Sequence, residues 1–198
     1  MAGSSRSQKI KVDVIWDFEG GWVHDKSTRE ALKQRIEASL KLVNDRYFVE
    51  NITAVGPSYG EKARALAPLI GQTNIVPLHI SEDNVRCGTE GCDNLAAFIP
   101  GKNDDELIMR TTDRADVLAM IKMYACVLSR EKNILVITGD QDFLAPIVAL
   151  TQFPTFTNVM VARSGATPSR RLCGKRTWIF EDMIMPGGCL PLRGGSIL

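Results

Sequence analysis

The sequence predicts an α/β fold in which a mostly parallel sheet is covered by helices on both faces. Segments of strand character and of helix character alternate from residue 11 to residue 180, which is typical of this class. Residues 133–138 are a short, mostly aliphatic run, as a strand buried on both faces requires. Acidic residues directly follow two of the predicted strands, at the edge where open α/β sheets bind ligands.

The first half of the chain supplies three predicted strands and two predicted helices. The strands span residues 11–16, 52–56 and 75–80. A long helix is predicted over residues 27–46, because Ser27 and Glu30 form a capping box at its start. Its buried stripe contains Leu32, Ile36, Leu40 and Val43. A shorter helix is predicted over residues 61–70, where Gly71 stops it.

The second half begins with an irregular stretch at residues 81–111, whose sequence allows a short strand or hairpin. A long helix is then predicted over residues 112–129, with Asp113 and Asp116 in its first turn, where the helix dipole favours acids. Its apolar face contains Val117, Leu118, Ile121, Tyr124, Ala125 and Leu128.

The predicted central strand, residues 133–138, ends at Gly139, and a helix over residues 143–152 follows with Asp142 as its N-cap. Predicted strands at residues 158–162 and 177–180 complete the sheet, and a polar, basic loop at residues 164–175 separates them.

Composition narrows the class of protein. The 198 residues are enough for one α/β domain with a sizeable core, and 44% of them are hydrophobic. No apolar run reaches the roughly 18–20 residues that a membrane-spanning helix needs, so no membrane partner is expected. Five cysteines without a secretory signal predict reduced thiols in an intracellular, cytoplasmic protein.

Charge is unevenly distributed along the chain. A net charge of +1 excludes a globally basic nucleic-acid binder but allows a local basic patch. Residues 163–176 contain no acid and five basic side chains suited to phosphate contacts, namely Arg163, Arg170, Arg171, Lys175 and Arg176. The same segment could equally be a solvated loop.

Acids gather at three places that the fold can bring together. Asp17 and Glu19 follow the first strand, Asp116 opens a helix, and Asp140 and Asp142 follow the central strand. Carboxylates crowded at one sheet edge repel one another unless a cation neutralises them. Magnesium and manganese prefer such oxygen ligands and can promote phosphodiester cleavage.

Each acid also has a purely structural interpretation. Asp116 suits the helix dipole, Asp142 suits an N-cap, and Asp17 suits a turn.

Residues 14–19, 113–119 and 137–144 resemble, in the same order, the three acidic motifs of NYN domains, which belong to the PIN-like nuclease superfamily. The resemblance implies a three-layer α/β/α PIN-like domain over residues 11–183. A disordered lead at residues 1–10 and a flexible tail at residues 184–198 are expected to flank it. NYN domains often carry Asn where this chain has Gly20, which predicts weaker activity or a remodelled first loop.

The resemblance further implies metal-dependent cleavage of RNA, with one or two Mg²⁺ or Mn²⁺ ions as cofactor. It assigns four catalytic, metal-binding acids: Asp17, Asp116, Asp140 and Asp142. Glu19 and Thr138 would support the site, and the five basic residues of the 163–176 segment would hold the strand. Single-stranded RNA is favoured over duplex, because sequence-tolerant grooves and base stacking suit a single strand.

Three further interpretations stay open. A catalytically weak or inactive NYN-like domain could bind RNA, a protein partner or a second copy of itself. A haloacid-dehalogenase-type phosphatase would need Asp-x-Asp after the first strand, whereas this chain has Asp17 and Glu19. Zinc at Cys87, Cys92 and His79 lacks a second close pair of ligands.

Overall fold

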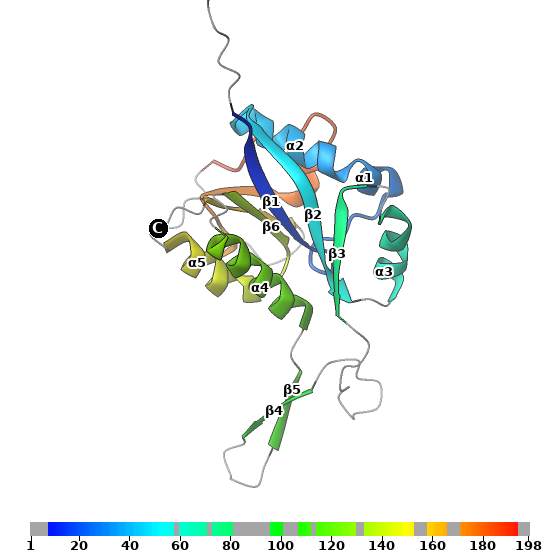
Figure 1. The fold of residues 1–198 in the computed structure, drawn as a ribbon, viewed down its shortest axis with the longest axis vertical. Coiled ribbons are helices and arrows are strands. Elements are labelled where there is room, and N and C mark those ends of the chain that lie inside the picture. The colour runs from blue at the N-terminus through cyan, green and yellow to red at the C-terminus, as the bar shows by residue number, and fades with distance from the viewer. Residues whose placement is uncertain are drawn as a thin grey trace, which may run out of the picture.

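A computed structural model describes residues 8–57, 60–70, 73–80, 96–100, 107–111, 114–129, 133–152, 158–165 and 171–193. Their elements follow one another in a strand–helix alternation (Figure 1): β1 Ile10–Asp17, α1 Lys26–Glu30, α2 Leu32–Val43, β2 Tyr47–Pro57, α3 Gly60–Leu66, the 3₁₀ helix η1 Ala67–Leu69, β3 Ile75–Ile80, β4 Ala96–Pro100, β5 Leu107–Thr111, α4 Arg114–Leu128, β6 Asn133–Thr138, the 3₁₀ helix η2 Gln141–Phe143, α5 Leu144–Gln152, β7 Asn158–Arg163, β8 Arg176–Ile179 and α6 Phe180–Met183.

The central sheet has six strands in the order β3-β2-β1-β6-β7-β8, and every neighbouring pair is parallel. The chain winds outward from β1 to β3, returns, and winds outward again from β6 to β8. The strand order therefore reverses between β1 and β6, and ligands of open α/β sheets bind in the crevice at such a switch point. The predicted α/β class with a mostly parallel sheet is confirmed.

Helices cover both faces of this sheet, so the protein has three layers, α/β/α, as expected (Figure 1). One face packs under α2 and shares a core with Val14, Trp16 and Leu40. The other face packs under α4 and α5, with Ile15, Val136 and Met123 in its core. Every residue of β6 is buried, as its aliphatic sequence predicted.

The first helix departs from the prediction in two ways. The predicted helix over residues 27–46 is divided at Ala31 into α1 and α2. Its N-cap is Asp25 rather than Ser27, so the predicted capping box is wrong. The Asp25 carboxylate accepts hydrogen bonds from the Thr28 amide and from the Ser27 and Thr28 hydroxyls. The helix begins at Lys26, so Ser27 lies inside its first turn and donates its hydroxyl to the cap. Leu32, Ile36 and Leu40 form the buried stripe as predicted.

The helix α4 does not bury the apolar face that the sequence predicted. Ala115, Ala119, Met123 and Cys126 face the sheet. Val117, Ile121, Tyr124 and Leu128, which belong to the predicted apolar face, are exposed. Ala115 and Ala119 let the helix lie close to β1 and β2, with Met123 filling the space beside them, and the four exposed side chains lie on the other side of the helix.

Two further segments lie outside the six-stranded sheet. The strands β4 and β5 form an antiparallel pair of their own, so residues 81–111 contain a hairpin, which the sequence allowed. After α6, residues 184–193 run back across the domain. The Leu192 amide donates to the Thr177 carbonyl over 2.7 Å, and the Cys189 amide donates to the Ser39 hydroxyl over 2.9 Å. The expected flexible tail is therefore hydrogen-bonded to the domain as far as residue 192.

Candidate functional site

The candidate site lies at the carboxyl ends of β1 and β6, the two strands that flank the switch point. Asp17 is the last residue of β1 and Thr138 is the last residue of β6. These strands pair in parallel, with Trp16 opposite Ile137, so their two following loops leave the sheet side by side. The parallel order thereby brings the first and third acidic motifs together.

The Asp17 carboxylate is held by three donors from the protein. Its side chain is only 5% exposed. Oδ1 accepts the amides of Glu19 over 3.0 Å and Gly20 over 3.1 Å, and Oδ2 accepts the Thr138 hydroxyl over 2.7 Å. Charge-assisted bonds of this kind fix a carboxylate in one orientation. The orientation of the Asp17 carboxylate is therefore set by the protein itself.

Thr138 joins the two acidic loops. Its fully buried hydroxyl donates to Asp17 and accepts the amide of Asp140 over 3.0 Å. One side chain thus satisfies groups from both loops and fixes their spacing. The supporting role of Thr138 in a catalytic site stays a prediction.

Asp140, and not Asp142, is the N-cap after β6. Its Oδ1 accepts the amide of Asp142 over 2.9 Å and so caps η2. Both residues have suitable chemistry for a cap, but only Asp140 has the extended backbone that a cap needs, with φ −89° and ψ 132°. Asp140 is half-buried and Asp142 is exposed. The predicted N-cap at Asp142 is wrong, and Asp142 lies at the surface, where it lines a depression along α5.

The remaining acids lie around this pair of loops. Glu19 is exposed, and its carbonyl accepts Lys62 of α3 over 2.8 Å. Asp116 is half-buried in the first turn of α4. The N-terminal end of α4 lies at the same edge of the sheet as the carboxyl ends of β1 and β2 (Figure 1). The topology therefore brings all four predicted acids to one edge.

The donors of this edge suit a hard cation, because they are carboxylate and hydroxyl oxygens without sulfur or imidazole. Among the described residues, however, no three His, Cys, Asp or Glu side chains form a group that could hold a metal ion. The acids therefore lie at one edge of the sheet and all offer oxygen ligands, but the Asp17 carboxylate already accepts hydrogen bonds from the protein.

The five predicted RNA-binding residues do not share one location. Arg163 ends β7 opposite Thr138, and its Nε is buried without a hydrogen-bond partner among the described residues. Lys175 and Arg176 lie at the other edge of the sheet, where the Lys175 amide bonds the carbonyl of Val159 at the start of β7. A parallel crossover must return the chain to that edge. Arg171 is exposed, and Arg170 lies outside the described residues.

Two supporting contacts were not foreseen from the sequence. Lys62 holds the first acidic loop from α3, and its Nζ lies 5.9 Å from the ring centroid of Trp22. Glu181 accepts the Ser164 hydroxyl and the Gly165 amide, each over 2.9 Å, and so fixes the loop after β7. Neither residue belongs to a local motif, so only the folded chain reveals them.

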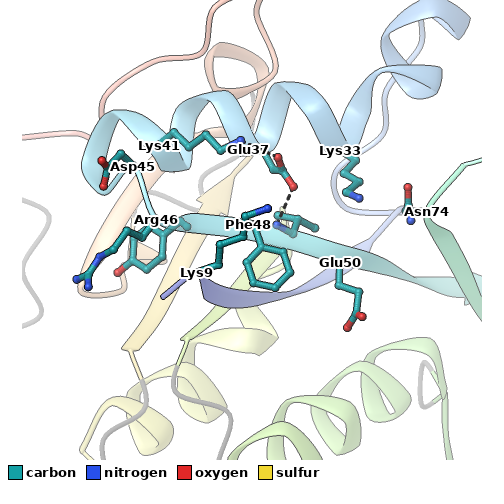
Figure 2. A pocket seen from close by; sticks show the side chains of 11 residues that line it. Lys9, Lys33, Glu37, Lys41, Asp45, Arg46, Phe48, Glu50 and Asn74 are labelled. Atoms are coloured by element: carbon teal, nitrogen blue, oxygen red, sulfur yellow. Dashed lines mark hydrogen bonds and ion pairs between the residues drawn. The ribbon is translucent and has the colours of Figure 1, made fainter. Parts of the chain in front are cut away.

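A pocket of about 320 Å³ lies at α2 and β2, beside the amino end of β2 (Figure 2). Its charged lining combines four cations with three acids: Lys9, Lys33, Lys41, Arg46, Glu37, Asp45 and Glu50. Glu37 is occupied by Lys41 and by the Val49 amide. This nearly balanced lining gives no reason to favour an anionic ligand there.

Comparisons with known proteins bear on the fold only. No family model and no curated protein matches the chain. A crystal structure of a protein of unknown function from Vibrio parahaemolyticus is similar, with a TM-score of 0.52 and 15% sequence identity over 84% of this chain and 88% of that one. No helix among the described residues is long and apolar enough to cross a membrane.

Proposed function

We propose that the protein is a metal-dependent endoribonuclease that hydrolyses phosphodiester bonds of single-stranded RNA at the carboxyl edge of its sheet. The observation that supports this most is the Thr138 hydroxyl, which ties Asp17 to the loop of Asp140 at the switch point. Placing two acidic loops side by side has an electrostatic cost, since like charges repel. A site for a cation and a phosphate explains the arrangement.

Four acids would hold Mg²⁺ or Mn²⁺: Asp17, Asp116, Asp140 and Asp142. When bound, such an ion neutralises phosphate oxygens and makes water a stronger nucleophile. Asp17, fixed by three donors, would keep the geometry of the site, and the more exposed Asp140 and Asp142 would contact the ion directly.

Arg163 would bind the RNA backbone beside these acids. It ends the strand next to β6, and a guanidinium pairs well with phosphate. Among the described members of the five basic residues, Arg163 is the one that lies opposite Thr138 on the paired strand.

The test is cleavage of an end-labelled single-stranded RNA with Mn²⁺, Mg²⁺ or EDTA. Asp140→Asn should abolish cutting while preserving the fold, because asparagine caps helices as well as aspartate does. Asp45→Asn is the matched control, since Asp45 is an exposed acid before β2 at the other edge. Metal-independent cutting, or full activity of Asp140→Asn, would reject the proposal.

Metal binding has a readout that does not depend on cleavage. At ten times its dissociation constant, a bound ion stabilises the folded state by about 1.4 kcal/mol. Mn²⁺ should therefore raise the melting temperature of the wild type and of Asp45→Asn, but not that of Asp140→Asn.

A second candidate is a catalytically weak or inactive domain that binds RNA or a protein. The three protein donors on Asp17 favour it, because they occupy carboxylate lone pairs that would otherwise face a metal ion. Binding of the labelled RNA without cleavage, weakened by Arg163→Ala, would support this candidate.

A further inference from the structure

The outer side of α4 carries a continuous apolar stripe. Val117, Ile121, Tyr124 and Leu128 are 40%, 57%, 40% and 83% exposed. They recur at intervals of four, three and four residues, which places them on one side of the helix. This is the spacing of a seam along which two helices pack. A surface helix of a globular protein normally carries polar residues there.

The neighbouring helix extends the apolar surface. The helices α4 and α5 contact each other on the same face of the sheet (Figure 1). The helix α5 has no charged residue. A shallow depression of about 570 Å³ along it is lined by the apolar Leu144, Ala145, Val148 and Ala149, and by the polar Gln141, Asp142 and Gln152. The apolar part of this depression can accept side chains from outside.

We propose that this face joins two copies of the chain, with α4 of one copy packed antiparallel against α4 of the other. The first reason is symmetry. The intervals four, three and four read the same in both directions. A two-fold axis at the middle of the seam therefore sets Val117 opposite the other copy's Leu128, and Ile121 opposite its Tyr124. A seam of this kind is self-complementary, as a two-fold interface requires.

The second reason is that the other helices with an apolar stripe use it within their own chain. Among the described residues, the apolar stripes of α2 and α5 face their own sheet through Leu32, Ile36 and Leu40 and through Ile147 and Leu150. Among the described helices, a second copy of α4 is therefore the partner that fits the exposed stripe of α4 best, because the stripes of the others are already covered.

Size and charge agree with this occupant. A helix of 15 residues is about 22 Å long, and with α5 alongside, the face projects onto roughly 400 Å². Stable specific interfaces begin at about 600 Å² per partner, so a face of this size fits a weak, concentration-dependent dimer. The only charged residues of α4 and α5 are Arg114, Asp116 and Lys122, and none belongs to the stripe.

Sedimentation velocity of the full chain over roughly a hundredfold range of concentration tests the proposal. The wild type should reach twice the monomer mass of 21.8 kDa at high concentration. Ile121→Glu and Leu128→Glu should stay monomeric, because an exposed position tolerates glutamate in the monomer but not in the seam. Leu42→Glu is the matched control: Leu42 is 51% exposed on α2, on the opposite face of the sheet, and its variant should dimerise like the wild type.

A charge pair tests the antiparallel register. Ile121→Lys and Tyr124→Glu should each weaken the dimer, and the double variant should restore it through two ion pairs between copies. Circular dichroism confirms that each variant is folded.

A wild type that is monomeric at every concentration overturns the proposal and indicates that another part of the chain covers the stripe. A dimer that survives Ile121→Glu and Leu128→Glu overturns it as well, and a double variant that stays monomeric overturns the register.

Discussion

The backbones of Gly20 and Gly139 lie in direct contact where the loops after β1 and β6 leave the sheet. A Cβ at Gly139 would collide with the carbonyl oxygen of Gly20. A Cβ at Gly20 would collide with Asp17 Oδ2 and would lie 2.7 Å from the Gly139 amide nitrogen. Neither position can carry a side chain without moving a loop. Gly20 is thus the residue that this packing requires.

Gly20→Ala should destabilise the protein by about 1–3 kcal/mol, the usual cost of overpacking a filled site. Gly21→Ala is the matched control, because a Cβ there would meet no atom closer than 3.3 Å. Urea unfolding compares the two variants. If Gly20→Ala is as stable as Gly21→Ala, the two loops can move apart at little cost and the tight contact is not needed for the fold.

Thr138→Val should lower the free energy of unfolding by about 1–3 kcal/mol, because it removes the buried hydroxyl that donates to Asp17 and accepts the Asp140 amide. Thr138→Ser keeps the hydroxyl and loses one methyl group, at a cost of about 1 kcal/mol. If the hydroxyl also sets the spacing of the acidic loops, RNA cleavage should fall in the valine variant and persist in the serine variant. Equal stability and equal activity of the two variants would contradict this role.

The N-cap of α1 predicts a pH dependence. Hydrogen bonds from the Ser27 hydroxyl and from Thr28 lower the pKa of Asp25 from 3.8 to about 2. The unfolded chain therefore takes up this proton first as the pH falls. The stability that Asp25 contributes is complete above pH 4 and is lost toward pH 2.

Asp25→Ala should accordingly melt at a lower temperature than the wild type at pH 6, and the difference should close near pH 2. Asp45→Ala, which removes an exposed acid that caps no helix, should show no such convergence. A constant difference between wild type and Asp25→Ala across this range would show that the cap does not act through the charged carboxylate.

The sequence predicted regular elements best where one pattern had no competitor. The strands β3 and β6 have the predicted bounds, because their short apolar runs stand between clear breaks. The starts of α1 and η2 were harder to predict, because each has two possible capping residues close together in the sequence. Asp25 competes with Ser27, and Asp140 competes with Asp142. The choice depends on backbone angles, which the sequence does not state.

The buried face of α4 could not be predicted because the helix is apolar nearly all round. Size then decides: Ala115 and Ala119 allow close approach to the sheet, so Ile121 and Leu128 are left outside. At the candidate site, the acids of the two loops were predicted correctly to share an edge. Their linkage through Thr138 and the contact of Gly20 with Gly139 depend on which strands are neighbours, and the sequence alone does not give the strand order.

Ser39 attaches the segment after α6 to the domain, which gives a final prediction. Its fully buried hydroxyl donates to the Met183 carbonyl over 2.7 Å and accepts the Cys189 amide over 2.9 Å. The Trp178 indole donates to the Cys189 carbonyl over 3.1 Å in the same region. Burial, followed by the nearby charge of Asp182, raises the pKa of the Cys189 thiol.

Ser39→Ala should therefore cost about 1–3 kcal/mol by leaving two backbone groups unpaired. It should also speed labelling of Cys189 by a thiol reagent at neutral pH, because a released segment exposes the thiol and returns its pKa toward the ordinary value. Mass spectrometry of the labelled peptide separates Cys189 from the other cysteines. Ser129→Ala, at the exposed end of α4, is the matched control. Unchanged labelling in Ser39→Ala would show that other contacts hold this segment in place.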